Sequence, residues 1–125
     1  MKITADTSVI VASFASWHQH HALAVDAFRR IDVIVAHCLL ETYSVLTRLP
    51  PPHRMSAEVV AEYLQTAFGD HAVVALPANE HRKLVATCAA HGLSGGAVYD
   101  AAIGATTMHA RAKLSRSTLA LARRT

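Results

Sequence analysis

The chain has 125 residues, of which 52% are hydrophobic and 17% charged, and its net charge is +3. This length fits a single domain, 1–125, whose core needs no disulfide, and the apolar composition suggests a buried sheet or a face that meets a partner. No apolar run approaches the roughly 20 residues of a membrane span and residues 1–6 do not resemble a signal peptide, so we expect a cytoplasmic protein without a membrane partner.

Short apolar runs alternate with stretches of helical periodicity along the whole chain. In chain order they predict a strand over 2–5, helices over 8–15 and 20–31, a strand over 33–36, a helix over 39–49, a helix that begins after Ser56, a strand over 72–76, helices over 79–91 and 97–109, and a strand over 112–115.

Local signals set the ends of several of these helices. The prolines at 50–52 must end the helix over 39–49, because proline cannot continue the hydrogen-bond ladder. Ser56 is the expected N-cap of the next helix, and Gly92 is the expected left-handed residue that closes the helix over 79–91. The inner face of the helix after Ser56 is expected to consist of Val59, Val60, Tyr63 and Leu64.

Strands that are apolar on both faces and separated by helices predict the α/β class. The expected architecture is a three-layer α/β/α sandwich around a central parallel sheet. Such sheets carry their functional sites at the carboxyl ends of the strands. Acidic side chains that follow strands are therefore the first candidates for chemistry.

Three acidic residues have that placement. Asp6 follows the first strand, whereas Glu41 and Asp100 are expected in the first turns of their helices. Carboxylates that share a pocket repel one another, and a hard divalent cation such as Mg²⁺ resolves that repulsion because it prefers oxygen ligands. The sequence alone leaves an alternative open for each acid, as a helix cap or a first-turn acid that the helix dipole favours.

Other polar residues suggest supporting roles. The hydroxyl groups of Thr7 and Ser8 are candidates to support the carboxylates. Residues 101–125 carry no acid, and their cations favour a polyanionic partner or act as a solubilising end.

Cys38 and Cys88 lie in apolar stretches and are expected to be buried free thiols. We set aside a zinc site at His18–His21, because His20 and His21 point to different helix faces and no HExxH motif occurs.

Three motifs resemble a known family when they are taken together and in order. They are Ala5-Asp6-Thr7-Ser8-Val9-Ile10, Leu40-Glu41-Thr42-Tyr43-Ser44-Val45-Leu46-Thr47-Arg48 and Gly95-Gly96-Ala97-Val98-Tyr99-Asp100-Ala101-Ala102. With them the chain resembles the PIN-domain ribonucleases, and most closely the VapC-like toxins of bacterial toxin–antitoxin pairs.

The resemblance implies an α/β/α sandwich and a Mg²⁺- or Mn²⁺-dependent endoribonuclease. Asp6, Glu41 and Asp100 fall on the acidic metal-site positions of the family. The resemblance also implies a homodimer that is inhibited by a VapB-like antitoxin. The family commonly carries a fourth acid after the last strand, and here Ser117 stands in that place. A serine lacks the carboxylate charge, although its hydroxyl group is able to hold a metal-bound water.

The resulting hypothesis is a toxin that hydrolyses RNA phosphodiester bonds. In it Asp6 and Asp100 hold the metal, and Glu41 is a third ligand or positions water. The basic residues assigned to RNA phosphates are Arg48, Arg111, Lys113 and Arg116. Two alternatives remain: a weakened binding module that pairs with an antitoxin but cuts poorly, and a small metal-dependent phosphoesterase that acts on DNA or nucleotides.

Overall fold

The computed structural model of the chain describes residues 1–115. Strands and helices alternate along these residues in the order that the periodicity predicts. The elements are β1 (Lys2–Ala5), α1 (Thr7–Phe14), α2 (His21–Phe28), β2 (Val33–Val35), α3 (Ala36–Arg48), α4 (Ala57–Phe68), β3 (Ala72–Val74), the 3₁₀ turn η1 (Ala78–Glu80), α5 (His81–Ala90), α6 (Gly96–His109) and β4 (Ala112–Ser115).

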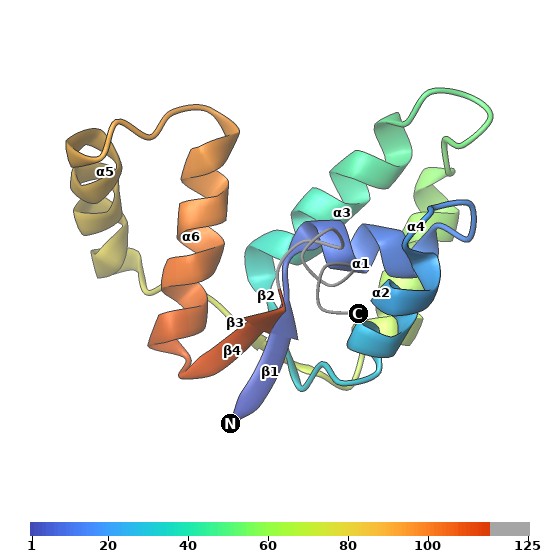
Figure 1. Cartoon of the computed structure of the whole chain (residues 1–125), viewed down its shortest axis with the longest axis horizontal. Helices are drawn as coiled ribbons and strands as arrows, with labels where there is room; N and C mark the ends of the chain where they lie inside the picture. The colour runs from blue at the N-terminus through green and yellow to red at the C-terminus, as the bar shows by residue number, and fades with distance from the viewer. Residues whose placement is uncertain (116–125) are drawn as a thin grey trace.

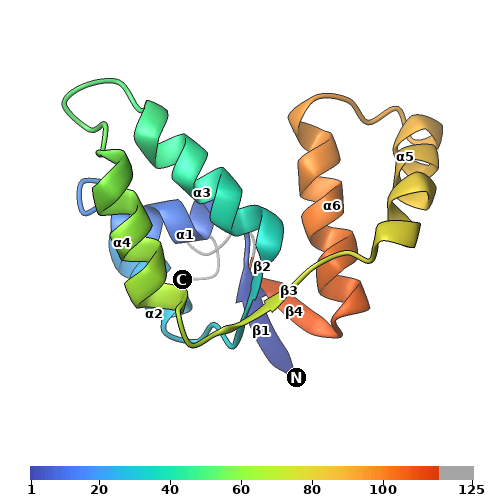
Figure 2. The ribbon, with the colours of Figure 1, turned by 180° about the vertical axis from the view of Figure 1, so that it is seen from behind.

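The strands lie between two groups of helices, as Figures 1 and 2 show from opposite sides. Helices α1 to α4 cover one side, and α5 and α6 cover the other. This arrangement confirms the expected α/β/α class. Among residues 1–115, no helix combines the length and the apolar character that crossing a membrane requires.

All the strand pairs described are parallel. Hydrogen bonds join β1 to β4 and β2 to β3. Asp32 connects the two pairs at one end, because its N–H donates to the Ile3 carbonyl at 2.7 Å and its carboxylate accepts from the Ile3 N–H at 2.8 Å. The carboxyl ends of the strands therefore face one edge, where α1 and α3 begin.

The core lies between the strands and helices α1 to α3. β2 is buried along its whole length, since it is central and apolar on both faces. Helix α1 packs against α2 and α3, and rings from α1, α2 and α4 form an aromatic cluster of Phe14, Phe28 and Phe68. The strands were expected to be covered on both faces, but β3 is not, because Val73 remains 54% exposed.

The predicted helix ends are largely confirmed. Ser56 caps α4 by accepting a hydrogen bond from the Val59 N–H at 3.3 Å. Gly92 adopts a φ of +67° after α5, and the Leu93 N–H reaches back to the Cys88 carbonyl at 2.9 Å, which closes the helix in a Schellman motif. Helix α3 begins earlier than predicted, at Ala36, because it follows β2 without a loop.

The predicted inner face of α4 is only half correct. Val60 is buried and Leu64 partly buried, whereas Val59 and Tyr63 are exposed. Tyr63 nevertheless stacks on Phe14, with ring centroids 4.9 Å apart. The buried stripe of α4 is narrower than predicted, because α4 lies on the outside of the molecule and contacts its neighbours along one face.

Candidate active site

Asp6 stands at the junction between β1 and α1. Its N–H donates to the Ser115 carbonyl at 2.9 Å, which ties it to the end of β4. Its Oδ1 accepts from the Ser8 hydroxyl at 2.7 Å and from the Val9 N–H at 3.2 Å. Asp6 is therefore the N-cap of α1, and the cap fixes its carboxylate at the carboxyl end of β1.

Glu41 projects from α3 beside the end of β2. Its Oε2 accepts a hydrogen bond from His37 Nε2 at 2.7 Å, one helical turn earlier, and the two side chains are about one-third exposed. Glu41 is the sixth residue of α3, in the second turn and not the first as predicted, because the helix starts at Ala36. The helix dipole acts mainly within the first turn, so it explains this acid less well.

Cys38 lies close enough to both carboxylates for their charges to act on its thiol. Its side chain is fully buried, and its Sγ donates to the Ala5 carbonyl at 3.8 Å. Burial is the largest cause that raises the pKa of the thiol, the Glu41 and Asp6 charges add to it and hydrogen bonding with Thr7 opposes it, and together they bring the pKa to about 11. Asp6 and Glu41 thus lie close enough to the same sulfur atom to influence it electrostatically. Both cysteines are free and buried, as predicted.

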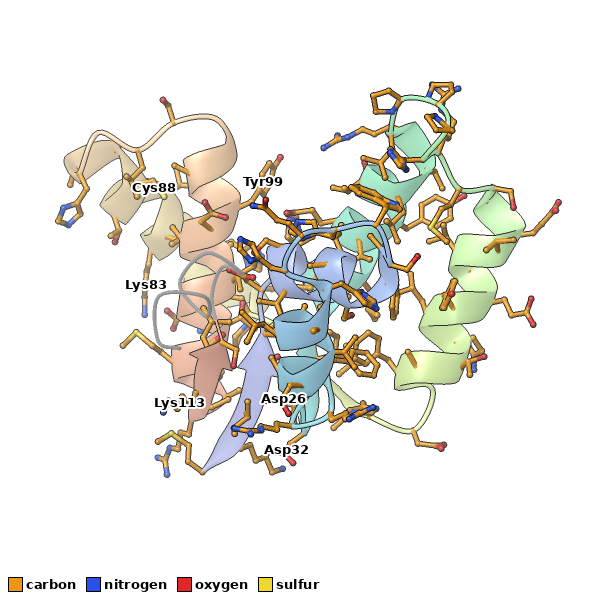
Figure 3. All side chains as sticks on the ribbon, turned by 45° about the vertical axis from the view of Figure 1, so that its right-hand side comes forward. Asp26, Asp32, Lys83, Cys88, Tyr99 and Lys113 are labelled. Atoms are coloured by element: carbon orange, nitrogen blue, oxygen red, sulfur yellow. The ribbon has the colours of Figure 1, made fainter. Side chains whose placement is uncertain are left out.

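Asp100 approaches the same edge from the opposite layer. It is exposed and occupies the fifth position of α6, again beyond the first turn, because the helix begins at Gly96. The neighbouring Tyr99 ring stacks on His37 with centroids 4.9 Å apart and an interplanar angle of 14°. Figure 3 shows Tyr99 extending from this end of α6 toward the helices on the other side. That stack joins α6 to α3 beside the acids.

The three acids share an edge, but they do not close into a compact cluster. Within residues 1–115, no group of three His, Cys, Asp or Glu side chains has metal-binding proximity. Asp6 and Glu41 both act on the Cys38 thiol, whereas Asp100 projects from α6 in the other helical layer. The donors are nevertheless all carboxylate oxygens, which is the ligand type that Mg²⁺ and Mn²⁺ prefer. The chemistry of the donor set therefore fits a hard divalent cation.

The predicted supporting hydroxyls behave differently from one another. Ser8 donates directly to Asp6, as its assigned role requires. Thr7 is buried and lies against the Cys38 thiol instead. Ser117, the residue in the place of the fourth acid, lies outside the described residues.

The predicted RNA-contacting cations are not gathered at one place. Arg48 ends α3 and lines the same cavity as Glu41. Arg111 and Lys113 lie at the amino-terminal end of β4, whereas the acids follow the carboxyl ends of the strands. Figure 3 accordingly shows Lys113 far from Tyr99. Arg116 lies beyond the part of the chain that the structure describes. Of the predicted cations within residues 1–115, Arg48 alone lines a cavity with one of the acids.

Sequence reasoning missed two residues that share the face of α3 with Glu41. His37 precedes it by four positions and Ser44 follows it by three, so all three lie on one side of the helix. This spacing was the available signal, but the predicted helix began at Leu39 and left His37 outside it.

The histidines near residue 20 make local hydrogen bonds. His18 Nδ1 accepts from the His20 N–H at 3.0 Å, and His21 Nδ1 pairs with the Ala12 carbonyl at 2.7 Å. Burial and the nearby His20 and His21 lower the pKa of His18. These contacts hold the turn between α1 and α2.

Comparison with known protein families identifies the family of this chain. The family model described as "PIN domain" matches residues 3–117, nearly the whole chain. The chain belongs to the PIN-domain family. The elements that carry the three acids in this PIN domain all lie inside the matched range.

Curated relatives extend the same conclusion. "Ribonuclease VapC40" of Mycobacterium tuberculosis, from the strains CDC 1551 / Oshkosh and ATCC 25618 / H37Rv, is 48% identical over 112 residues, which cover 90% of this PIN domain and 83% of the relative. "Ribonuclease VapC27" of strain ATCC 25618 / H37Rv is 34% identical over 114 residues, which cover 90% of this chain and 82% of the relative. No solved structure matches the chain significantly.

Proposed function

We propose that this PIN domain is a metal-dependent endoribonuclease and the toxin of a toxin–antitoxin pair. The observation that carries the proposal is the 48% identity to a protein named as a VapC ribonuclease, along 90% of the chain. The strand-end carboxylates support it, because they supply the hard oxygen donors that such an enzyme requires. We expect RNA in the cytoplasm to be the substrate.

Asp6, Glu41 and Asp100 are the residues proposed to hold Mg²⁺ or Mn²⁺. When bound, such an ion lowers the pKa of a water molecule and stabilises the charge that develops on a phosphodiester. The chain's own task is to orient the ligands. The Ser8 hydroxyl and the Val9 N–H hold the Asp6 carboxylate in one direction.

His37 performs the same task for Glu41. Its hydrogen bond to Oε2 restricts the rotation of a long side chain, and its stack on Tyr99 restricts the imidazole itself. Residues that orient metal ligands typically change metal affinity or activity by about 10- to 100-fold when they are replaced. We therefore assign His37 as a positioning residue of the proposed site.

Partners are part of the proposal. The VapC names of the relatives support a cognate VapB-like antitoxin, and we expect a homodimer as the assembled form. The exposed apolar residues on α3, β3 and α5 support contact with another chain.

The decisive experiment measures the cleavage of total cellular RNA and of a DNA control with Mg²⁺, with Mn²⁺ and with EDTA. We expect wild type to cut RNA only with metal, and Asp6→Asn and Asp100→Asn each to lower the rate by at least about 100-fold, because each removes a charged ligand. Asp70→Asn, in an exposed turn before β3, is the matched control and should cut like wild type. Equal rates for all four proteins would contradict the assignment.

One observation favours a second function. Ser117 stands where the family commonly has a fourth acid, so the chain is also a candidate for a binding module that pairs with an antitoxin and cuts poorly. Metal-independent capture of the antitoxin without RNA cleavage would support that alternative. Cleavage of the DNA control in place of RNA would instead indicate the other alternative, a small metal-dependent phosphoesterase that acts on DNA or nucleotides.

A further inference from the structure

An open cavity of about 440 Å³ lies beside Glu41, between α3 and the beginning of α6. Its volume falls within the roughly 300–1,000 Å³ that is typical of small-ligand pockets. The side chains that line it are His37, Leu40, Glu41, Ser44, Arg48 and Tyr99. Its lining therefore combines a carboxylate, a hydroxyl, a cation, an aliphatic surface and two aromatic rings.

The polar part of the lining is one face of α3. His37, Glu41, Ser44 and Arg48 are spaced by four, three and four residues, so they form a stripe along the helix. Helical rise separates Glu41 from Arg48 by about 10 Å along the axis. A short piece of single-stranded nucleic acid spans that distance, with one end at the acidic site and the other at the cation.

Tyr99 supplies an aromatic surface at the wall of the cavity. His37 stacks on its ring at 4.9 Å, and Tyr99 is still 55% exposed. Because His37 is itself bonded to Glu41, the tyrosine is held in place relative to the carboxylate. An exposed ring that is fixed in this way is suited to stack on a nucleobase, since every base offers a π face.

Arg48 supplies the charge that complements a phosphate. It is exposed in the last turn of α3, and among residues 1–115 no carboxylate lies within ion-pair distance of it. Arg30 differs, because it is paired with Asp26. The Arg48 guanidinium is therefore available for the two parallel hydrogen bonds that it makes to phosphate oxygens.

We propose that this cavity binds one nucleotide of single-stranded RNA next to the bond that is cut. The base stacks on Tyr99, the phosphate pairs with Arg48, and His37 positions the tyrosine. The proposal rests on the proposed ribonuclease function, because it places the nucleotide beside Glu41. It adds a binding subsite to the metal-ligand assignment.

The test is the binding of fluorescein-labelled single-stranded oligoadenylate and oligouridylate to the full chain, measured by fluorescence anisotropy with EDTA to prevent cleavage. We expect Tyr99→Leu to raise Kd by roughly 5- to 100-fold, the range for loss of one stacked base, and Arg48→Gln to raise it about 10-fold. The matched controls are Tyr43→Leu, an exposed tyrosine that lines a separate groove on α3, and Arg82→Gln, an exposed arginine on α5. Both controls should bind like wild type.

Two further measurements separate stacking from a structural effect. On an abasic sugar–phosphate oligomer, Tyr99→Leu should bind like wild type, whereas Arg48→Gln should still bind more weakly. His37→Phe keeps a ring against Tyr99 and should retain RNA binding, but His37→Ala should lose it. Circular dichroism melting of each variant checks that the fold is intact.

The outcomes distinguish this subsite from the proposed activity. If Tyr99→Leu and Arg48→Gln both bind RNA like wild type, or if the Tyr43→Leu control weakens binding equally, the subsite is overturned even when wild type cuts RNA. If wild type binds RNA and the two variants bind it more weakly as expected, but wild type never cuts RNA, the subsite stands and the ribonuclease proposal fails.

Discussion

At the scale of single residues, the side chains near the acids are shaped by neighbours from other parts of the chain. Cys38 is the clearest case, since it is fully buried and the charges of both Asp6 and Glu41 act on it. Its apolar surroundings could be predicted from Val35 to Leu40, but its proximity to Asp6 depends on how β1 and α3 meet. The same holds for His37, whose partner Glu41 is one turn away in sequence and whose stacking partner Tyr99 is far along the chain.

The raised pKa of Cys38 predicts a loss of stability at alkaline pH. The thiol ionises near its ordinary pKa of 9.0 in the unfolded chain but near about 11 in the folded one. Between these values the unfolded state alone releases the proton, so the free energy of unfolding falls as pH rises, by about 2 to 3 kcal/mol in total. Below pH 9 this contribution is fully present.

Urea unfolding in the presence of EDTA measures this effect. The pH range runs from about 8, one unit below the pKa of the unfolded state, to about 11, the pKa of the folded state. Because lysines and tyrosines also titrate there, the readout is the difference between wild type and Cys38→Ala. The difference should shrink steadily above pH 9. A difference that stays constant through this range would contradict the pKa assignment.

At the scale of elements, the entry to α6 determines where Tyr99 and Asp100 stand. Gly95 has a φ of +58° and a ψ of −137°, a combination outside the left-handed helical region that other residues reach. Gly96 begins the helix with ordinary dihedrals, and a Cβ there would meet nothing within 4 Å. The two adjacent glycines are therefore not equivalent.

These two glycines form a matched pair for mutation. Gly95→Ala should destabilise the protein by about 1 to 3 kcal/mol, because alanine is strained at that backbone conformation. Gly96→Ala should be neutral or stabilising by up to about 1 kcal/mol, since it reduces the entropy of the unfolded chain. Urea denaturation of both variants gives the comparison, and equal effects would show that the turn tolerates a side chain.

At the scale of the whole molecule, the layer of α5 and α6 leaves apolar surface open. A cavity of about 320 Å³ lies between this layer and the ends of β2 and β3, lined largely by aliphatic side chains. Val85 on α5 is 67% exposed at its border. Apolar surface of this kind is typical of an interface with another chain.

We therefore expect a dimer in which α5 takes part. Light scattering at micromolar concentration should give twice the mass of the chain for wild type, and Val85→Lys should shift the mass toward the monomer because it places a charge in the contact. Thr87→Lys, on the other face of α5, is the control and should stay dimeric. A monomeric wild type would count against the expected homodimer.

The sequence by itself determined the order of strands and helices and several of the helix caps, and it singled out the three acids as candidates. These features depend on local periodicity, on proline, serine and glycine at helix ends, and on motifs that are contiguous in the chain. Asp6 at a strand end and Ser56 as a cap follow from neighbours within a few residues.

Only the tertiary structure decided which of these residues meet. The stack of His37 on Tyr99 and the proximity of Cys38 to Asp6 join segments that are far apart in sequence. It also separated Arg48, at the acidic edge, from Arg111 and Lys113 at the opposite one. Charge and periodicity do not encode that difference, because it arises from the direction in which each strand enters the sheet and each helix returns.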